Sequence, residues 1–174
     1  MKSIPNLLSL ARLAAAPYLF LVLWHRQWSS ALAVIVFAAV TDFLDGFLAR
    51  RWQVNSAFGE ALDPIADKAL LSGAFVALWL AGSIEGWLAG VVLGRDALIL
   101  LFAGVVLLVS KDRRRFPPSQ LGKISTGMQI ALVIAIAMQV PAAIIEILKW
   151  ATVALTAGSG IDYAGTALGL TQRR

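Results

Sequence analysis

Long apolar stretches follow one another through this chain, and only short polar segments separate them. Apolar runs of this length with few charges are typical of transmembrane helices. Of the 174 residues, 59% are hydrophobic and 14% are charged, whereas a soluble domain has about 25% charged residues. We therefore expect an all-α integral membrane protein in which residues 1–174 form a single domain.

Hydropathy places six transmembrane helices along the chain. The expected spans are Leu13–Trp24, Ala31–Leu48, Pro64–Leu80, Trp87–Val109, Ser125–Val140 and Ala142–Ser159. A short amphipathic segment, from Ser3 to about Arg12, leads into the first span. Some spans are short for a hydrocarbon core of about 30 Å, so we expect tilted helices or shared polar cavities.

The positions of lysine and arginine predict the orientation of these spans. With six spans, one side of the membrane receives Lys2, Arg12, Arg50, Arg51, Lys111, Arg113, Arg114, Arg115, Lys123, Arg173 and Arg174. The other side receives His25-Arg26 and the turns around Glu85 and Pro141. We therefore expect both termini to be cytoplasmic. The net charge of +5 then indicates contact with anionic lipid headgroups, and no nucleic-acid partner is expected.

Several kinds of site are excluded by composition. The chain has no cysteine and a single histidine, His25. Disulfides, zinc–thiolate sites and thiol catalysis are therefore impossible, and one histidine cannot build a histidine metal site.

Four aspartates are spaced at helical intervals where the second expected span ends and the third begins. Asp42 and Asp45 are three residues apart, and Asp63 and Asp67 are four apart, so each pair shares one helix face. Carboxylates are costly near a bilayer and indicate a functional site there. If the two faces turn toward each other, the carboxylates form the oxygen cage that Mg²⁺ or Mn²⁺ prefers.

Small residues and an arginine extend this pattern, which reads Asp42-x2-Asp45-Gly46-x2-Ala49-Arg50-x8-Gly59-x3-Asp63-x3-Asp67. Taken singly, its parts have ordinary structural interpretations. Asp45-Gly46 is a common turn, Asp63-Pro64 is a helix N-cap followed by proline, and Arg50-Arg51 is a topology anchor. Eight specified positions at fixed spacing favour a joint function.

The complete pattern resembles the signature of the CDP-alcohol phosphotransferases, integral membrane enzymes of phospholipid synthesis, and no signature position is substituted. The likeness covers nearly the whole chain and is similar to the bacterial phosphatidyltransferase branch. It includes Ile4-Pro5-Asn6-Leu7-Leu8 with Arg12, Leu62-Asp63-Pro64-Ile65-Ala66-Asp67-Lys68, Gly122-Lys123 and Ser159-Gly160-x-Asp162-Tyr163.

This resemblance implies transfer of a phosphatidyl group from CDP-diacylglycerol to an alcohol, with release of CMP. A pair of Mg²⁺ or Mn²⁺ ions would be held by Asp42, Asp45, Asp63 and Asp67, and Asp67 would also be the general base. The CDP-lipid would be bound by Asp42, Asp45, Gly46, Ala49, Arg50 and Gly59. The resemblance also implies a homodimer in the bilayer of a bacterial inner membrane, and the placement of lysine and arginine puts the aspartates on the cytoplasmic side.

The acceptor is expected to be a phosphorylated alcohol, bound by Arg95 and Lys123 together with Asn6 and Arg12, because arginine suits phosphate recognition. Glycerol 3-phosphate fits, and its product would be phosphatidylglycerol phosphate. The sequence Gly94-Arg95-Asp96 instead resembles the branch that makes cardiolipin from phosphatidylglycerol, since Arg-Glu is expected in the glycerol-phosphate branch. Phosphatidylglycerol is therefore the alternative acceptor.

A divalent-cation transporter is the alternative from another class of protein. Its acidic residues would be distributed along a path near the membrane midplane. Here the aspartates gather at one end of the spans, and the last two expected spans contribute only Glu146. The sequence therefore favours the enzyme.

Overall fold

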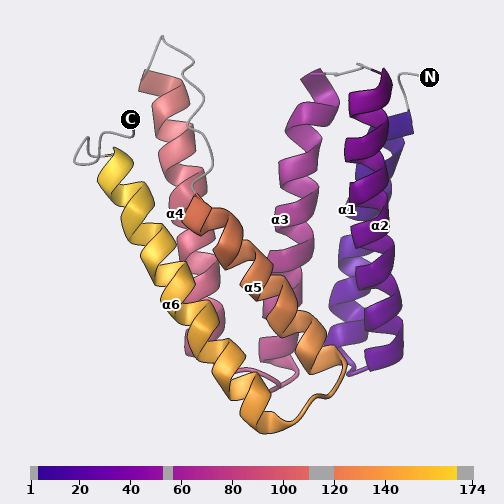
Figure 1. Ribbon diagram of the computed structural model, residues 1–174, viewed down its shortest axis with the longest axis vertical. Coiled ribbons are helices and arrows are strands. Elements are labelled where there is room, and N and C mark those ends of the chain that lie inside the picture. The colour runs from indigo at the N-terminus through magenta and orange to yellow at the C-terminus, as the bar shows by residue number, and fades with distance from the viewer. Residues whose placement is uncertain (1–3, 53–56, 110–119, 168–174) are drawn as a thin grey trace. The chain divides into compact units, whose positions relative to one another are not determined.

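The computed structural model describes residues 4–52, 57–109 and 120–167, all of which lie in helices or in short turns between them (Figure 1). Side chains are described for residues 10–44, 66–101 and 120–163. The helices are α1 (Ile4–Trp24), α2 (Trp28–Trp52), α3 (Ala57–Leu80), α4 (Gly86–Val109), α5 (Gln120–Ala137) and α6 (Ala142–Ala167). The prediction of an all-α chain is confirmed for these residues.

The helices differ from the expected spans mainly at their ends. The amphipathic N-terminal segment and the first span form one continuous helix, because α1 begins at Ile4. The N-cap interpretation of Asp63-Pro64 is wrong, since α3 begins at Ala57 and already contains both residues. Hydropathy marks only the apolar part of a helix, whereas backbone hydrogen bonding continues into its polar ends.

Two of the described helical segments are long and apolar enough to cross a membrane. They are Gln120–Ala137 in α5 and Ala142–Tyr163 in α6. Shorter apolar stretches lie in α1 and α2, at Leu10–Trp24 and Trp28–Leu44. Many large apolar side chains on these helices are exposed, as Ile147 is. Apolar side chains pointing outward in such numbers fit apolar surroundings.

Contacts group the chain into two compact units. The first consists of Met1–Ile84 and Val133–Gln139, and the second of Glu85–Leu132 and Val140–Arg174. The first unit therefore holds α1, α2, α3 and the end of α5. The second holds α4, most of α5, and α6.

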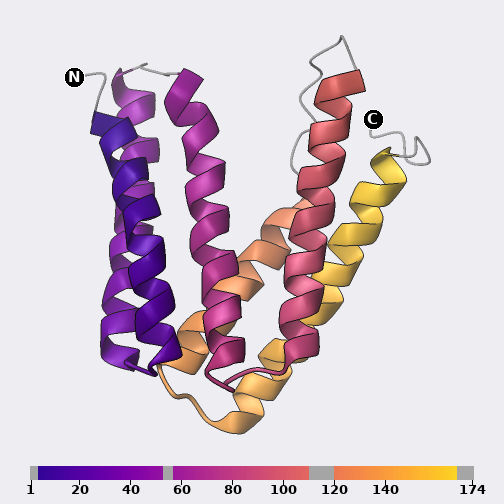
Figure 2. The ribbon, with the colours of Figure 1, turned by 180° about the vertical axis from the view of Figure 1, so that it is seen from behind.

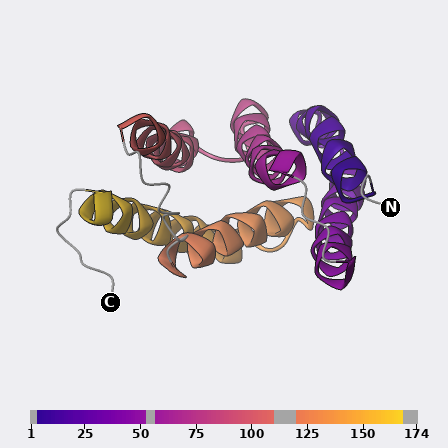
Figure 3. The same ribbon diagram turned by 90° about the horizontal axis from the view of Figure 1, so that it is seen from above.

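In the first unit, α1 packs against both α2 and α3. The three helices run side by side from opposite viewpoints (Figures 1 and 2), and the view from above shows α1 next to each of the other two (Figure 3). Leu19 and Leu23 of α1, and Phe75 and Leu78 of α3, are fully buried. These side chains form the apolar core that holds α1 against α3.

The turn after α1 is tied to the end of α3. Arg26 adopts the left-handed backbone conformation, with φ of 55°, which lets the chain reverse into α2. Its guanidinium donates hydrogen bonds from Nε and Nη2 to the carbonyl oxygen of Ala81. That oxygen follows the last turn of α3, where carbonyl groups have no partner within the helix. The arginine therefore satisfies a backbone acceptor that the helix leaves open.

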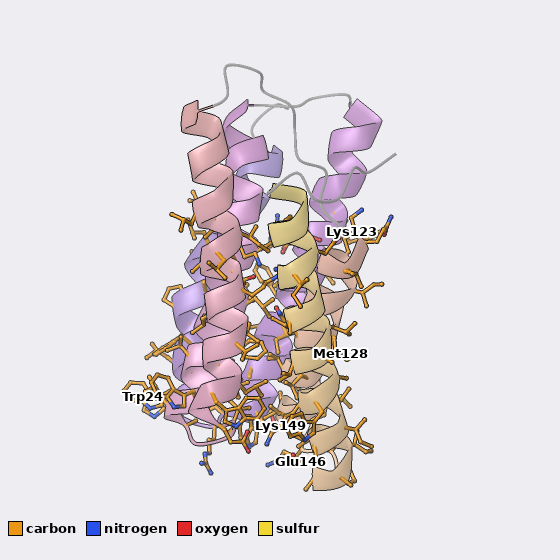
Figure 4. All side chains as sticks on the ribbon, turned by 90° about the vertical axis from the view of Figure 1, so that its left-hand side faces the viewer. Trp24, Lys123, Met128, Glu146 and Lys149 are labelled. Carbon is orange, nitrogen blue, oxygen red and sulfur yellow. The ribbon has the colours of Figure 1, made fainter. Side chains whose placement is uncertain are left out.

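In the second unit, α4 packs along α6, and an ion cluster lies where the two helices begin. Lys149 Nζ of α6 donates to Glu85 Oε1 at 2.9 Å and to Glu146 Oε1 at 2.7 Å; Figure 4 shows Lys149 and Glu146 close together. Lys149 is buried, so two carboxylates offset a charge that would be costly alone. The rings of Trp87 and Trp150, with centroids 5.5 Å apart, join the same helices.

We predict that Glu85 makes the stability of the protein depend on pH. The Lys149 ammonium holds the pKa of the Glu85 carboxyl below its ordinary value, mainly through their hydrogen bond. A carboxyl with a lowered pKa in the folded state stabilises the fold above its ordinary pKa, and this contribution is lost as pH falls through the lowered value. The apparent Tm of the wild type should exceed that of Glu85→Gln near pH 7, and the difference should shrink below about pH 4.5.

Thermal unfolding of both proteins in detergent, at several pH values between about pH 3 and pH 7, measures this difference. Half of the Glu85 side chain is exposed, so solvent screening keeps the effect small. A difference in apparent Tm that does not change with pH would contradict the assignment.

Candidate functional site

The two aspartate pairs lie on two continuous helices of the first unit. Asp42 and Asp45 belong to α2, together with Gly46, Ala49 and Arg50. Gly59, Asp63 and Asp67 belong to α3. Because neither helix is interrupted, the expected spacing along a helix holds for each pair. The side chains of residues 45–65 lie outside the described part of the chain, so the structure describes Asp42 and Asp67 of the four.

Arg12 of α1 joins these two aspartates. Its Nη1 donates to Asp42 Oδ1 at 2.6 Å and to Asp67 Oδ1 at 2.7 Å. One nitrogen atom therefore gathers carboxylate oxygens from two helices, and the side chains of Asp42 and Asp67 converge on it. The sequence pattern gave no sign of this contact, because Arg12 is separated from the two aspartates by 30 and 55 residues.

The burial of the three side chains is uneven. The Arg12 side chain is 2% exposed, whereas those of Asp42 and Asp67 are 64% and 58% exposed. A cation from outside can therefore reach both carboxylates. Carboxylate oxygens that converge from two helices suit hard divalent cations such as Mg²⁺ and Mn²⁺. Among the residues whose side chains are described, no group of three or more acidic, histidine or cysteine side chains could hold a metal ion. Asp42 and Asp67 are two of the four predicted ligands, so the metal site stays a prediction.

A second arginine lies in the interior of the second unit. Arg95 and Asp96 of α4 are both buried, as suits charged side chains on an apolar helix. Arg95 Nη1 donates to Asp96 Oδ1 at 2.8 Å, and Nη2 donates to Ser159 Oγ at 2.7 Å. The guanidinium carbon lies 5.7 Å from the centre of the Tyr163 ring, a cation–π distance.

The remaining nitrogen of the Arg95 guanidinium is Nε. This atom is buried and has no hydrogen-bond partner among the described residues. A buried donor without an acceptor is costly, so Nε is available to an anionic ligand oxygen. Sequence analysis found Arg95 and Asp96, and it noted Ser159 and Tyr163 only as part of the family likeness.

The remaining residues expected to bind the acceptor belong to different units, Lys123 to the second and Asn6 and Arg12 to the first. Lys123 of α5 is exposed and lies well away from Lys149 (Figure 4). Asn6 belongs to α1, but its side chain lies outside the described residues. Arg12 contacts the two aspartates instead of standing open to a ligand. Binding of the acceptor by this set therefore stays a prediction.

A buried polar cluster in the second unit was missed by sequence analysis. The hydroxyls of Ser125 and Thr156 are 3.1 Å apart, and Gln129 Nε2 donates to Thr156 Oγ1 at 3.2 Å. All three residues are fully buried. Polar side chains at such helix contacts join helices in apolar surroundings. Ser125 and Gln129 are four residues apart on α5, and this spacing of polar residues in an apolar span was the signal in the sequence that could have revealed the cluster.

Thr156 and Thr152 provide a matched test of this cluster. Both are fully buried on α6, one turn apart, but Thr152 Oγ1 has no hydrogen-bond partner among the described residues. Thr156→Val should cost about 1–3 kcal/mol, because it leaves partners unsatisfied. Thr152→Val, which removes an unsatisfied hydroxyl, should be neutral or stabilising. Thermal unfolding measures both, at roughly 2–4 °C per kcal/mol, and equal losses would refute the network.

The family of this chain follows from comparison with known proteins. Residues 2–158 match the family model described as CDP-alcohol phosphatidyltransferase. That range contains the whole aspartate pattern, Arg12 and Arg95. The chain therefore belongs to the CDP-alcohol phosphatidyltransferase family, as the resemblance in its sequence predicted.

Similar proteins carry two kinds of name. The cardiolipin synthase (CMP-forming) of Homo sapiens is 35% identical over 150 residues, which cover 76% of this chain and 49% of the human protein. The probable cardiolipin synthase (CMP-forming) of Drosophila melanogaster is 34% identical over 75% of this chain and 45% of that protein. This chain thus spans about half the length of these relatives.

A bacterial relative matches from end to end. The CDP-diacylglycerol--glycerol-3-phosphate 3-phosphatidyltransferase of Rickettsia typhi is 30% identical over 173 residues, which cover 94% of this chain and 96% of that protein. The three relatives therefore carry two kinds of name, one for a CMP-forming cardiolipin synthase and one for a glycerol-3-phosphate phosphatidyltransferase that uses CDP-diacylglycerol.

Proposed function

We propose that this protein is a membrane phosphatidyltransferase of phospholipid biosynthesis, which transfers the phosphatidyl group of CDP-diacylglycerol to an alcohol and releases CMP. The observation that carries the proposal is the complete aspartate pattern on α2 and α3, in which Asp42 and Asp67 converge. Membership of the family supports the reaction class. A divalent-cation transporter gains no support from these findings.

Each residue of the pattern has a role in this proposal. Asp42, Asp45, Asp63 and Asp67 hold a pair of Mg²⁺ or Mn²⁺ ions, which when bound neutralise the pyrophosphate of the donor. Asp67 accepts the proton of the attacking hydroxyl. Arg50 binds the pyrophosphate, and Gly46, Ala49 and Gly59 leave room for CMP against the backbone. The acyl chains of the lipid remain in the bilayer.

For the acceptor we propose a phosphorylated alcohol that binds at Arg95, with Lys123 and Asn6 contributing. Arg95 supports this role because its guanidinium is held by Asp96 and Ser159 while its buried Nε has no partner among the described residues. A guanidinium oriented in this way is prepared for a phosphate oxygen. Glycerol 3-phosphate is the first candidate, and the relative from Rickettsia typhi carries a name of that kind.

Phosphatidylglycerol is the second candidate for the acceptor, and two observations support it. Asp96, and not glutamate, follows Arg95, and relatives named cardiolipin synthase are among the similar proteins. Phosphatidylglycerol also carries a phosphate, so the arrangement around Arg95 serves either acceptor. An assay with both substrates decides between them.

The proposal includes the membrane arrangement. All six helices span the bilayer, residues 1–174 act as one domain, and the termini and the aspartates face the cytoplasm of a bacterial inner membrane. The apolar length of α5 and α6 and the distribution of basic residues support this topology. The protein is further proposed to be a homodimer with one active site in each protomer.

Asp67→Asn tests the general base. Amide nitrogen and oxygen cannot accept the proton as a carboxylate does, so CMP release should fall by roughly 10²–10⁴-fold. The variant should elute from a sizing column as the wild type does. Glu146→Gln, which removes a carboxylate that pairs with Lys149, should retain CMP release. Full activity of Asp67→Asn would end the general-base assignment.

The acceptor is tested by CMP release from CDP-diacylglycerol in mixed micelles with Mg²⁺, with glycerol 3-phosphate and phosphatidylglycerol offered in parallel. We expect turnover with glycerol 3-phosphate and formation of phosphatidylglycerol phosphate. Turnover with phosphatidylglycerol alone would identify a cardiolipin synthase. No CMP with either acceptor, or with other alcohols, would contradict the proposed function.

A further inference from the structure

Arg12 is a buried cation inside the aspartate site of the first unit. Its side chain is 2% exposed, although it belongs to a helix with an otherwise apolar buried face. A buried guanidinium is costly unless carboxylates are paired with it and hydrogen-bonded to it. Asp42 and Asp67 provide that pairing, at 2.6 Å and 2.7 Å from the same Nη1. The arginine therefore depends on the two aspartates.

The two aspartates depend equally on the arginine. They come from different helices, and their Oδ1 atoms both lie within 2.7 Å of one nitrogen. Two carboxylates held this close repel each other unless a positive charge lies between them. Arg12 supplies such a charge from α1, the helix that packs against both α2 and α3.

We propose that Arg12 is the internal counter-ion of this site, which neutralises Asp42 and Asp67 and holds them together when no divalent cation is bound. This inference rests on the proposed function only in that the two aspartates are taken as cation ligands. Arg12 approaches from the buried side, and more than half of each aspartate side chain remains exposed. A cation can therefore bind carboxylates that are already in place.

This role differs from acceptor binding, which was expected for Arg12 because arginine suits phosphate recognition. A guanidinium that donates to two carboxylates through one nitrogen is committed to them, and its burial separates it from a soluble phosphate. Arg12 thus acts through the aspartates as a positioning residue, comparable to the outer groups that orient metal ligands in other proteins.

The test is the thermal stability of the metal-free protein, measured in EDTA. Arg12→Gln should lower the apparent Tm by about 5 °C or more, because it leaves two carboxylates close together without a counter-charge. Adding Asp67→Asn to Arg12→Gln should recover most of this loss, since the repulsion is then removed. In the wild-type background, Asp67→Asn should not stabilise the protein, because Arg12 then loses a partner.

Arg26→Gln is the matched control. Arg26 also lies in the first unit and is exposed, and it donates to the backbone oxygen of Ala81. Its effect should be the same with and without Asp67→Asn, because no carboxylate is involved. If the loss of apparent Tm depends on Asp67 for Arg12→Gln but not for Arg26→Gln, then its cause is the missing charge of Arg12 and not the removal of an arginine in general.

Three outcomes would overturn the inference. The first is an unchanged apparent Tm for Arg12→Gln, and the second is a loss of Tm in Arg12→Gln that adding Asp67→Asn does not recover. The third is that adding Asp67→Asn to Arg26→Gln recovers as much Tm as adding it to Arg12→Gln. If Arg12→Gln cannot be purified, the double variant decides: its recovery as folded protein supports the counter-ion, and its failure contradicts it. None of these measurements requires turnover, so failure of the proposed reaction would appear separately, as absent CMP release by the wild type.

Discussion

One guanidinium shared between two carboxylates connects all three helices of the first unit. Arg12 extends from α1, while Asp42 and Asp67 extend from α2 and α3. The buried apolar side chains Leu19, Leu23 and Phe75 lie where α1 packs against α3, but they do not specify where the aspartates point. The ion pairs do, because charged hydrogen bonds are directional. The convergence of carboxylates on which the proposed chemistry depends is thus maintained by a residue outside the signature.

Compensation of buried charge is the rule in the second unit as well. Arg95 is paired with Asp96, and Lys149 with Glu85 and Glu146. An unpaired charge in apolar surroundings would cost several kcal/mol, and each buried cation among the side chains that the structure describes is accompanied by at least one carboxylate. The two buried cations differ in whether all of their hydrogen-bond donors have partners. Lys149 is enclosed between two acids, whereas Arg95 retains a buried Nε with no partner in the described part of the chain.

Much of this was predictable from the sequence. Apolar runs predicted the helices, and spacing placed the aspartate pairs on helix faces, because both properties are local. Contacts between distant residues were not predictable: no sequence pattern linked Arg12 to Asp42 and Asp67, and the charge of Lys149 was overlooked inside an apolar span. The Asp63-Pro64 dipeptide misled for a related reason, since its local preference for a helix start yields to a helix that begins at Ala57.

The central claim is that the aspartates of α2 and α3 form one site for divalent cations, and Mn²⁺ binding followed by electron paramagnetic resonance tests it most directly. The account predicts that the wild-type protein in detergent binds Mn²⁺, that Mg²⁺ competes for the site, and that Asp42→Asn combined with Asp67→Asn loses most of the binding. Equal binding of Mn²⁺ by the wild type and the double variant, or none by either, would contradict the account.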